Sequence, residues 1–228
     1  ICNQNMYTGY SQANTLLISG TLTGQCVIPK GKYVSNGLTV ASGAHLTIEA
    51  GAEIYFTTES GLTVSGEVTT TGLEEAPVII SGYGDELAWE GIVNRTGYMS
   101  GVRVNEGGVL KAEYTKFRNM QGVFSKETTG GSRYEVQKDR YYSGLLIFGT
   151  AEMNGCEIFA KNYKSQTTDR NYNTYPTTVT VWNHHTNTVE LLGIGSLHLS
   201  NSILVSGQCS ALIVLTNENS VIVEKSTI

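Results

Sequence analysis

The chain has 228 residues, of which 26 are glycine and only 3 are proline, a length that suits one domain or two small ones. Its net charge of −5, from 15 basic and 20 acidic residues, lacks the clustered positive charge that nucleic acids and anionic membranes require. No apolar run approaches the ~20 residues that span a bilayer. We therefore expect no nucleic-acid partner and no membrane insertion.

Residues 1–24 precede the regular pattern described below and are predicted to form an N-terminal cap segment. The four cysteines are Cys2, Cys26, Cys156 and Cys209, and an even number favours disulfides in an oxidising compartment. A Cys2–Cys26 bridge would attach the cap to the first coil, and coil stacking would bring Cys156 to Cys209. The alternative is that they are buried thiols, which behave as small hydrophobic groups.

Short apolar runs with glycine-containing breaks follow in chain order. They alternate apolar residues with threonine, which is period-2 patterning with one face in and one face out. Runs of three to five residues are too short for amphipathic helices, which need ~10 residues or more. The clearest of these runs are Leu38–Val40, Leu46–Ile48, Ile54–Phe56, Leu62–Val64, Val78–Ile80, Val102–Val104 and Tyr114–Phe117.

These runs predict an all-β fold, and two all-β architectures have to be considered. A sandwich or barrel usually has longer strands joined by hairpin turns. Here the best hairpin dipeptide, Asn36-Gly37, has no preceding strand of matching length. We therefore expect residues 25–228 to form a right-handed parallel β-helix with two loop insertions, in which each short strand stacks on the strand one coil earlier.

The same region resembles the opening coils of bacterial right-handed parallel β-helix surface proteins. The resemblance is good over about residues 37–125 and scattered afterwards. It implies a fold but no single function, because such scaffolds occur in adhesins, phage fibres and polysaccharide-active enzymes. The segments that carry it are Gly37–Val40, His45–Phe56, Gly61–Val68, Ala76–Ile80, Trp89–Ile92 and Gly108–Asn119.

Residues 126–143 and 161–176 interrupt the repeat and are predicted to be loop insertions on neighbouring coils. Six of the 13 tyrosines lie between Tyr134 and Tyr175, and tyrosine suits stacking on sugar rings or filling an interface. The alternative is that these rings pack the loops onto the helix wall. The predicted ligand-binding residues are Tyr134, Arg140, Tyr141, Tyr142, Tyr163, Tyr172 and Tyr175.

The sequence contains little that indicates catalysis. Its three aspartates are isolated, and there is no Asp-rich calcium cluster, C-x-x-C pair or Gly-rich phosphate loop. His184 and His185 are adjacent, and adjacent strand residues point to opposite faces, so they are poorly placed to share a metal. We expect no catalytic residues, no metal and no cofactor. The sequence leaves open whether the chain is an enzyme and favours a role without catalysis.

The leading hypothesis is a non-catalytic binding module, secreted or on the cell surface, that contacts a glycan or a surface protein through its Tyr-rich loops. A polysaccharide lyase or other carbohydrate-active β-helix enzyme is the alternative, with Lys138, Arg140, Tyr141 and Tyr142 as candidates for its base. A third possibility is a structural spacer in a larger fibre. Since no polar cap follows Val221–Val223, we also expect contact with further domains of the same chain at the C-terminal end.

Overall fold

The structure is a computed structural model that describes residues 15–57, 59–82, 99–132, 135–160, 167–171, 178–206, 209–215 and 220–228. These residues form strands and connecting turns without any α-helix, so the expected all-β class is confirmed for this part of the chain. None of them forms a helix long and apolar enough to cross a membrane.

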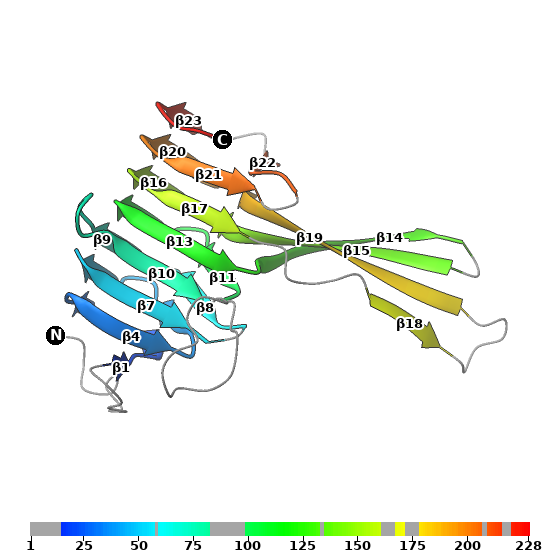
Figure 1. Cartoon of the computed structure of the whole chain (residues 1–228), viewed down its shortest axis with the longest axis horizontal. Coiled ribbons are helices and arrows are strands. Elements are labelled where there is room, and N and C mark those ends of the chain that lie inside the picture. Colours follow the sequence, from blue (N-terminus) through cyan, green and yellow to red (C-terminus); the bar gives the residue numbers. More distant parts are fainter. Residues whose placement is uncertain are drawn as a thin grey trace.

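The strands belong to three sheets, A, B and C, and the chain visits the sheets in that order again and again (Figure 1). Sheet A contains β1 (Thr15–Leu17), β4 (Gly31–Ser35), β7 (Ala52–Phe56), β10 (Val78–Gly82), β13 (Thr115–Met120), β17 (Glu157–Ala160) and β21 (Ile203–Ser206). Sheet B contains β2 (Gly20–Leu22), β5 (Leu38–Val40), β8 (Gly61–Val64), β11 (Gly101–Val104), β15 (Glu135–Ile147), β19 (Thr178–Leu191) and β22 (Leu212–Val214). Sheet C contains β3 (Gln25–Ile28), β6 (His45–Glu49), β9 (Glu67–Thr71), β12 (Val109–Glu113), β16 (Thr150–Asn154), β20 (Ser196–Ser200) and β23 (Val221–Glu224).

Within each sheet, consecutive passes of the chain pair in parallel. For example, β5, β8 and β11 are in register through Val40, Val64 and Val104. The apolar runs expected from the sequence are these strands, and the three parallel sheets are compatible with the expected β-helix. We call the three sheets together the stack.

The core lies between the three sheets, where inward side chains form ladders. Phe117 of β13 is in register with Ile80 and Ile158, and none of the three is more than 1% exposed. Burial of one such aliphatic or aromatic side chain stabilises by about 1.5–3 kcal/mol. A matching ladder in sheet B consists of Val40, Val64, Val104, Ile147 and Leu191, all buried.

Glycine marks the corner between sheets A and B, where successive passes approach closely. Gly101 has φ +134°, and a Cβ built there would lie 2.3 Å from the carbonyl oxygen of Gly144 on the next pass. Backbone conformation and space therefore both select glycine at this corner.

We expect Gly101→Ala to lower the free energy of unfolding by about 2 kcal/mol, because it combines backbone strain with a backbone clash. Chemical denaturation followed by circular dichroism measures this change. Gly130→Ala is the matched control, since a Cβ there has open space within 4 Å. Equal midpoints for the two variants would contradict the close approach at Gly101.

The cysteines only partly follow the sequence prediction. Cys156 and Cys209 are thiols and not disulfide partners, so the expected second bridge is wrong. The reason is topological: Cys156 lies at the corner between β16 and β17, whereas Cys209 lies between β21 and β22, at a different corner. Cys26 is buried, and Cys2 lies outside the described residues, so a Cys2–Cys26 bridge stays a prediction.

The predicted N-terminal cap also falls largely outside the described residues, which begin at 15. From there to residue 24 the chain forms β1 and β2, which pair in parallel with β4 and β5. This part of the expected cap segment is therefore the first pass through sheets A and B.

The two interruptions of the repeat are not loops where the structure describes them. The first contains most of a hairpin, in which β14 (Val123–Gly131) pairs antiparallel with β15. In the second, β18 (Thr167–Asn171) pairs antiparallel with β19. The prediction of a loop failed over the first interruption because residues 123–131 and 135–141 are exposed or half-buried on both faces, which removes the apolar alternation that identifies strands.

The hairpins lie side by side and continue sheet B away from the stack (Figure 1). β15 and β19 pair in parallel from Glu135 and Val179 to Ile147 and Leu191. The resulting strand order is β14, β15, β19, β18. We call the projecting part of these four strands, residues 123–143 and 167–187 as far as they are described, the wing.

Candidate functional site

The wing has two faces because neighbouring residues of a strand point to opposite sides. Arg140 and Tyr142 of β15 lie on one side, which we call the Arg140 face. Asp139 and Tyr141 lie on the other, the Tyr141 face. The in-register pairing of Tyr141 with His185 on β19 adds that imidazole to the Tyr141 face.

On the Arg140 face, charged side chains bridge the first hairpin. Glu127 of β14 accepts hydrogen bonds from Nε of Arg140 at 2.8 Å and from Nζ of Lys138 at 3.2 Å. The Arg140 side chain is 37% exposed, so its guanidinium still meets solvent. Such a partly exposed ion pair adds little stability but holds the guanidinium in one place.

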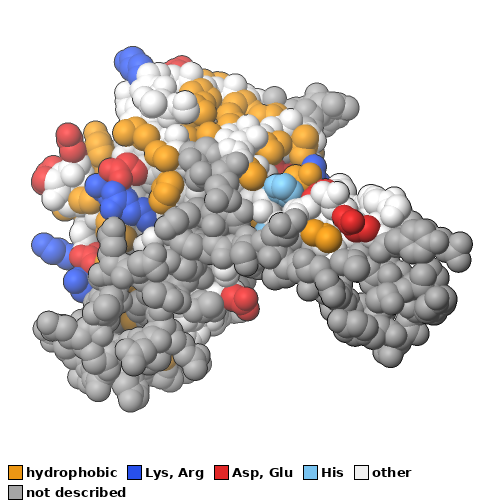
Figure 2. Space-filling view, turned by 45° about the vertical axis from the view of Figure 1, so that its right-hand side comes forward, with side chains coloured by type: hydrophobic (Ala, Val, Ile, Leu, Met, Phe, Trp, Pro, Cys, Tyr) orange, Lys and Arg blue, Asp and Glu red, His pale blue; other side chains and the backbone are white. Residues whose placement is uncertain are grey.

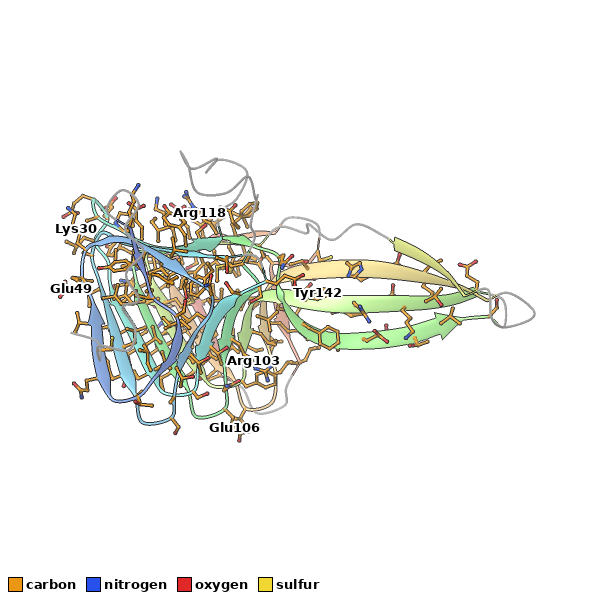
Figure 3. The ribbon with its side chains drawn as sticks, turned by 90° about the horizontal axis from the view of Figure 1, so that it is seen from below. Lys30, Glu49, Arg103, Glu106, Arg118 and Tyr142 are labelled. Carbon is orange, nitrogen blue, oxygen red and sulfur yellow. The ribbon has the colours of Figure 1, made fainter. Side chains whose placement is uncertain are left out.

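Tyr142 lies at the root of the wing (Figure 3). Its side chain is only 6% exposed. Its ring stacks on His184 with centroids 5.7 Å apart and packs edge-to-face with Phe124 with centroids 5.8 Å apart. Tyr142 thus packs the wing together, which is the alternative that the sequence left open for these tyrosines. Its placement does not favour the predicted ligand contact.

The Tyr141 face carries a second aromatic stack. The rings of Tyr141 and His185 are 5.0 Å apart at 23°, and Nζ of Lys126 lies 4.9 Å from the Tyr141 centroid. Asp139 accepts a hydrogen bond from Asn183 at 2.7 Å, and its Oδ1 lies 3.4 Å from Nε2 of His185. Cation, ring, imidazole and carboxylate therefore form one continuous surface.

The wing is joined to the stack through a buried carboxylate. Glu190 of β19 is 0% exposed, and Ser125 of β14 donates to its Oε1 at 2.8 Å while Ser143 of β15 donates to its Oε2. Thr186 adds a hydrogen bond from its hydroxyl to the carbonyl of Gln121. These contacts connect three strands at the root and set the direction in which the wing projects.

Two carboxylates of the wing, Glu127 and Asp139, are stabilised in their ionised form. Hydrogen bonds from Arg140 and then Lys138 hold the pKa of Glu127 below its ordinary value. The hydrogen bond from Asn183 is the main cause that lowers the pKa of Asp139, and His185 adds to it. Both groups therefore favour the folded wing when they are charged.

We expect the wing to loosen in acid while the stack persists. A carboxyl group whose pKa is lower in the folded than in the unfolded chain stabilises the fold. This stabilisation is fully present above the pKa of the unfolded chain, near 4, and is lost as the pH falls through the pKa of the folded chain. Amide hydrogen exchange is measured at pH 6 and at pH 3, and each rate is divided by the intrinsic rate at that pH. We expect the resulting protection to fall in acid at residues 126–129 and 138–141 and to stay the same in the buried strands. Uniform change across the chain would contradict this expectation.

The predicted ligand-binding residues are only partly brought together. Arg140 and Tyr142 share one face and Tyr141 lies on the other. Tyr134, Tyr163, Tyr172 and Tyr175 lie outside the described residues. Residues that the sequence analysis did not select complete both faces, namely Lys126, Glu127, Asp139, His184 and His185.

One available signal would have located the first hairpin. Gly130-Gly131 lies between two polar stretches of similar length, and a Gly-Gly dipeptide is typical of tight hairpin turns. The two glycines end β14, and the turn follows them, where the N–H of Ser132 donates to the carbonyl of Glu135. The contacts between the two hairpins had no such signal, because β15 and β19 pair residues more than 40 positions apart.

The outer wall of sheet C has a separate hollow of about 410 Å³. Lys111 in it donates to Glu67 at 2.9 Å, which is the main cause that lowers the pKa of Glu67, and Asn154 donates to Glu113 at 2.8 Å. The polar residues that line it are Thr69, Thr70, Lys111, Glu113, Glu152, Asn154, His198 and Ser200.

Among the described residues, no three His, Cys, Asp or Glu side chains are grouped in a way that would hold a metal ion. The comparisons identify no relative of the chain: it matches no protein-family model, no curated protein and no solved structure. The likeness to bacterial β-helix surface proteins therefore rests on the sequence motifs alone.

Proposed function

We propose that this chain is a secreted or cell-surface binding module, in which a right-handed parallel β-helix carries a projecting wing that contacts a glycan or a surface protein. One observation carries the proposal. Two hairpins inserted on successive passes pair in register into one sheet that projects from the stack, with aromatic and charged side chains on both faces. A stack that served only as a spacer would have no need of such an extension.

The cyclic order of three parallel sheets and the continuous inward ladders support the β-helix. Parallel crossovers within one sheet are right-handed in nearly all proteins, which supports the handedness. Such a scaffold is rigid because each pass is hydrogen-bonded to the next. Rigidity suits recognition, since the binding groups lose little conformational freedom when a partner docks.

The described wing residues offer the chemistry that the proposal needs. Tyr141 is partly exposed in a stack with His185, and a flat ring of this kind packs against the apolar face of a sugar or an interface side chain. Arg140 on the opposite face presents a partly exposed guanidinium, which suits carboxylate or hydroxyl groups. The buried Tyr142 supports these groups from the root of the wing.

The test compares single-residue variants of the two faces on a glycan array and on a cell-binding assay. We expect Tyr141→Ala or Arg140→Ala to weaken binding about tenfold, the scale on which one well-placed interface side chain acts. Which of the two weakens binding identifies the contact face. Arg118→Ala is the matched control for Arg140→Ala, because Arg118 is also paired with a glutamate, Glu157, but lies on sheet A.

The proposal fails if the folded protein binds neither array nor cells, or if both wing variants bind as well as the unmodified chain. Tyr142→Ala is unsuitable as a probe of contact, because removing a buried ring would disturb the wing itself. Unchanged thermal unfolding of the Arg140 and Tyr141 variants shows that any loss of binding arises at the surface.

A carbohydrate-active enzyme is the second candidate, and the hollow on sheet C favours it. Lys111 lies there beside Glu113 and Glu152, so a cation and carboxylates meet on one open wall. A lyase needs a base near a bound sugar acid. Incubation with acidic polysaccharides, read as absorbance of an unsaturated product, tests this candidate, and loss of the signal in Lys111→Ala would assign it to the hollow.

The C-terminal end of the stack supports a further contact. Hydrophobic side chains gather over this end of the molecule (Figure 2). Val223 is in register with the buried Leu199 but is itself exposed, because no described strand covers β23 on its outer side. We propose that another protein domain covers this end, whose exposed apolar residues include Ile203, Val205, Val214, Leu215, Ile222 and Val223.

A further inference from the structure

A cysteine, a histidine and an aspartate are aligned where the Tyr141 face meets the stack. Sγ of Cys209 lies 3.9 Å from Nδ1 of His185, and Nε2 of the same ring lies 3.4 Å from Oδ1 of Asp139. The imidazole thus joins a thiol on one side to a carboxylate on the other. Enzymes activate a nucleophile with this spatial order of groups, in which a base lies beside the nucleophile and a third group orients the base.

The surrounding structure holds each of the three groups. Thr188 of β19 donates its N–H to the carbonyl of Ser210 at 3.0 Å, which keeps the neighbouring Cys209 beside that strand. Tyr141 stacks on the His185 ring and limits its rotation. Asn183 donates to Asp139 at 2.7 Å and fixes the carboxylate. The alignment is therefore built by contacts from both β15 and β19.

The site is also open to reagents. His185 is 37% exposed and Asp139 27% exposed, and Cys209 is half-buried. Cys156 provides the contrast within the same chain: it is buried in the core, its Sγ lies 3.4 Å from the carbonyl of Ala112, and burial raises its pKa to about 12. Of these two cysteines, only Cys209 lies beside a base, and only Cys209 has access to solvent.

We propose that Cys209 is a nucleophile that accepts an acyl group from an activated ester or thioester, with His185 as its base and Asp139 as a positioning residue. Nδ1 of His185 takes the thiol proton as Sγ forms a bond to the carbonyl carbon. The bond from that carbon to the leaving oxygen or sulfur then breaks, and the proton on Nδ1 passes to the leaving group. The products are an S-acyl cysteine and a free alcohol or thiol, so no oxidant or further reagent is needed. This inference does not rest on the proposed binding function.

The test uses 4-nitrophenyl acetate as the acyl donor and the whole folded chain. We expect rapid release of one nitrophenol per chain and one acetyl group on Cys209, located by mass spectrometry of peptides, with Cys156 unmodified as the internal control. Slow hydrolysis of the thioester would convert the burst into turnover, which also supports the proposal.

Four variants assign the roles. Cys209→Ala should abolish the burst, and His185→Gln should slow acetylation about a hundredfold, the scale of general base catalysis. Asp139→Asn should slow it less, and Asp139→Glu should restore part of the rate, a rescue that a merely structural role would not produce. Unchanged thermal unfolding shows that the variants are folded.

The proposal is overturned if Cys209 of the unmodified folded chain is acetylated no faster than Cys209 of the His185→Gln variant. It is equally overturned if the acetyl group is found on lysine or tyrosine and not on Cys209. Neither result bears on the glycan and cell-binding assays, which use Arg140 and Tyr141 variants, so the two proposals succeed or fail separately.

Discussion

Phe117→Ala should lower the free energy of unfolding by about 3–5 kcal/mol, which is the usual effect of truncating a fully buried phenylalanine. The ring is 0% exposed and lies in the middle of a ladder, in register with Ile80 below and Ile158 above. Removing it leaves a cavity between three passes of the chain. Because the hydrogen-bonded backbone limits collapse around that cavity, little of the lost contact is recovered.

Urea denaturation followed by circular dichroism measures this effect, with Phe124→Ala as the matched control. Phe124 is 50% exposed on the wing and packs edge-to-face with the ring of Tyr142, so we expect its truncation to cost less than about 1.5 kcal/mol. Similar losses in the two variants would mean that the ladder does not dominate the stability of the stack.

Glu190→Ala should lower the free energy of unfolding by about 2–4 kcal/mol and free the wing at its root. The substitution leaves the hydroxyls of Ser125 and Ser143 without their acceptor, and a polar group left unsatisfied in a buried place costs about 1–3 kcal/mol. Ser143 is itself fully buried, so water does not readily replace the lost carboxylate.

Hydrogen exchange at residues 123–127 and 140–143 reports the loosening directly, beside the unfolding midpoint. Glu190→Gln is the control, because its amide oxygen keeps one acceptor and its shape fills the same space. We expect the Gln variant to lie within about 1 kcal/mol of the unmodified chain. A Gln variant as unstable as the Ala variant would show that the negative charge, and not hydrogen bonding, holds the root.

Much of the stack was predictable from local patterns. The Leu-Thr-Val runs of β5 and β8 place threonine outward and the aliphatic residues inward, as their period-2 alternation predicts. We also expected His184 and His185 to point to opposite faces. The ring of His184 stacks on Tyr142 on one face of the wing, and the ring of His185 stacks on Tyr141 on the other.

The wing was less predictable for a physical reason. Residues 126–131 and 135–141 bury little surface on either face, so polar residues occur on both faces and the sequence carries no periodic signal over 126–143. The predicted ligand residues followed tyrosine content, and that signal does not distinguish the buried Tyr142 from the partly exposed Tyr141. Cys209 was expected to pair with Cys156, because cysteine number and spacing say nothing about which corner of a pass each occupies.

The sequence by itself determined the all-β class, the short strands and the side of each that faces the core, because these depend on alternation between neighbouring residues. Only the tertiary structure decided that two insertions join into one wing, that Glu190 is buried beneath it, and that Asp139, His185 and Cys209 align. These contacts join residues 24 to 65 positions apart, and they depend on the register between strands of successive passes. Such a register is set by the summed packing and hydrogen bonding of whole strands, which no short segment of sequence contains.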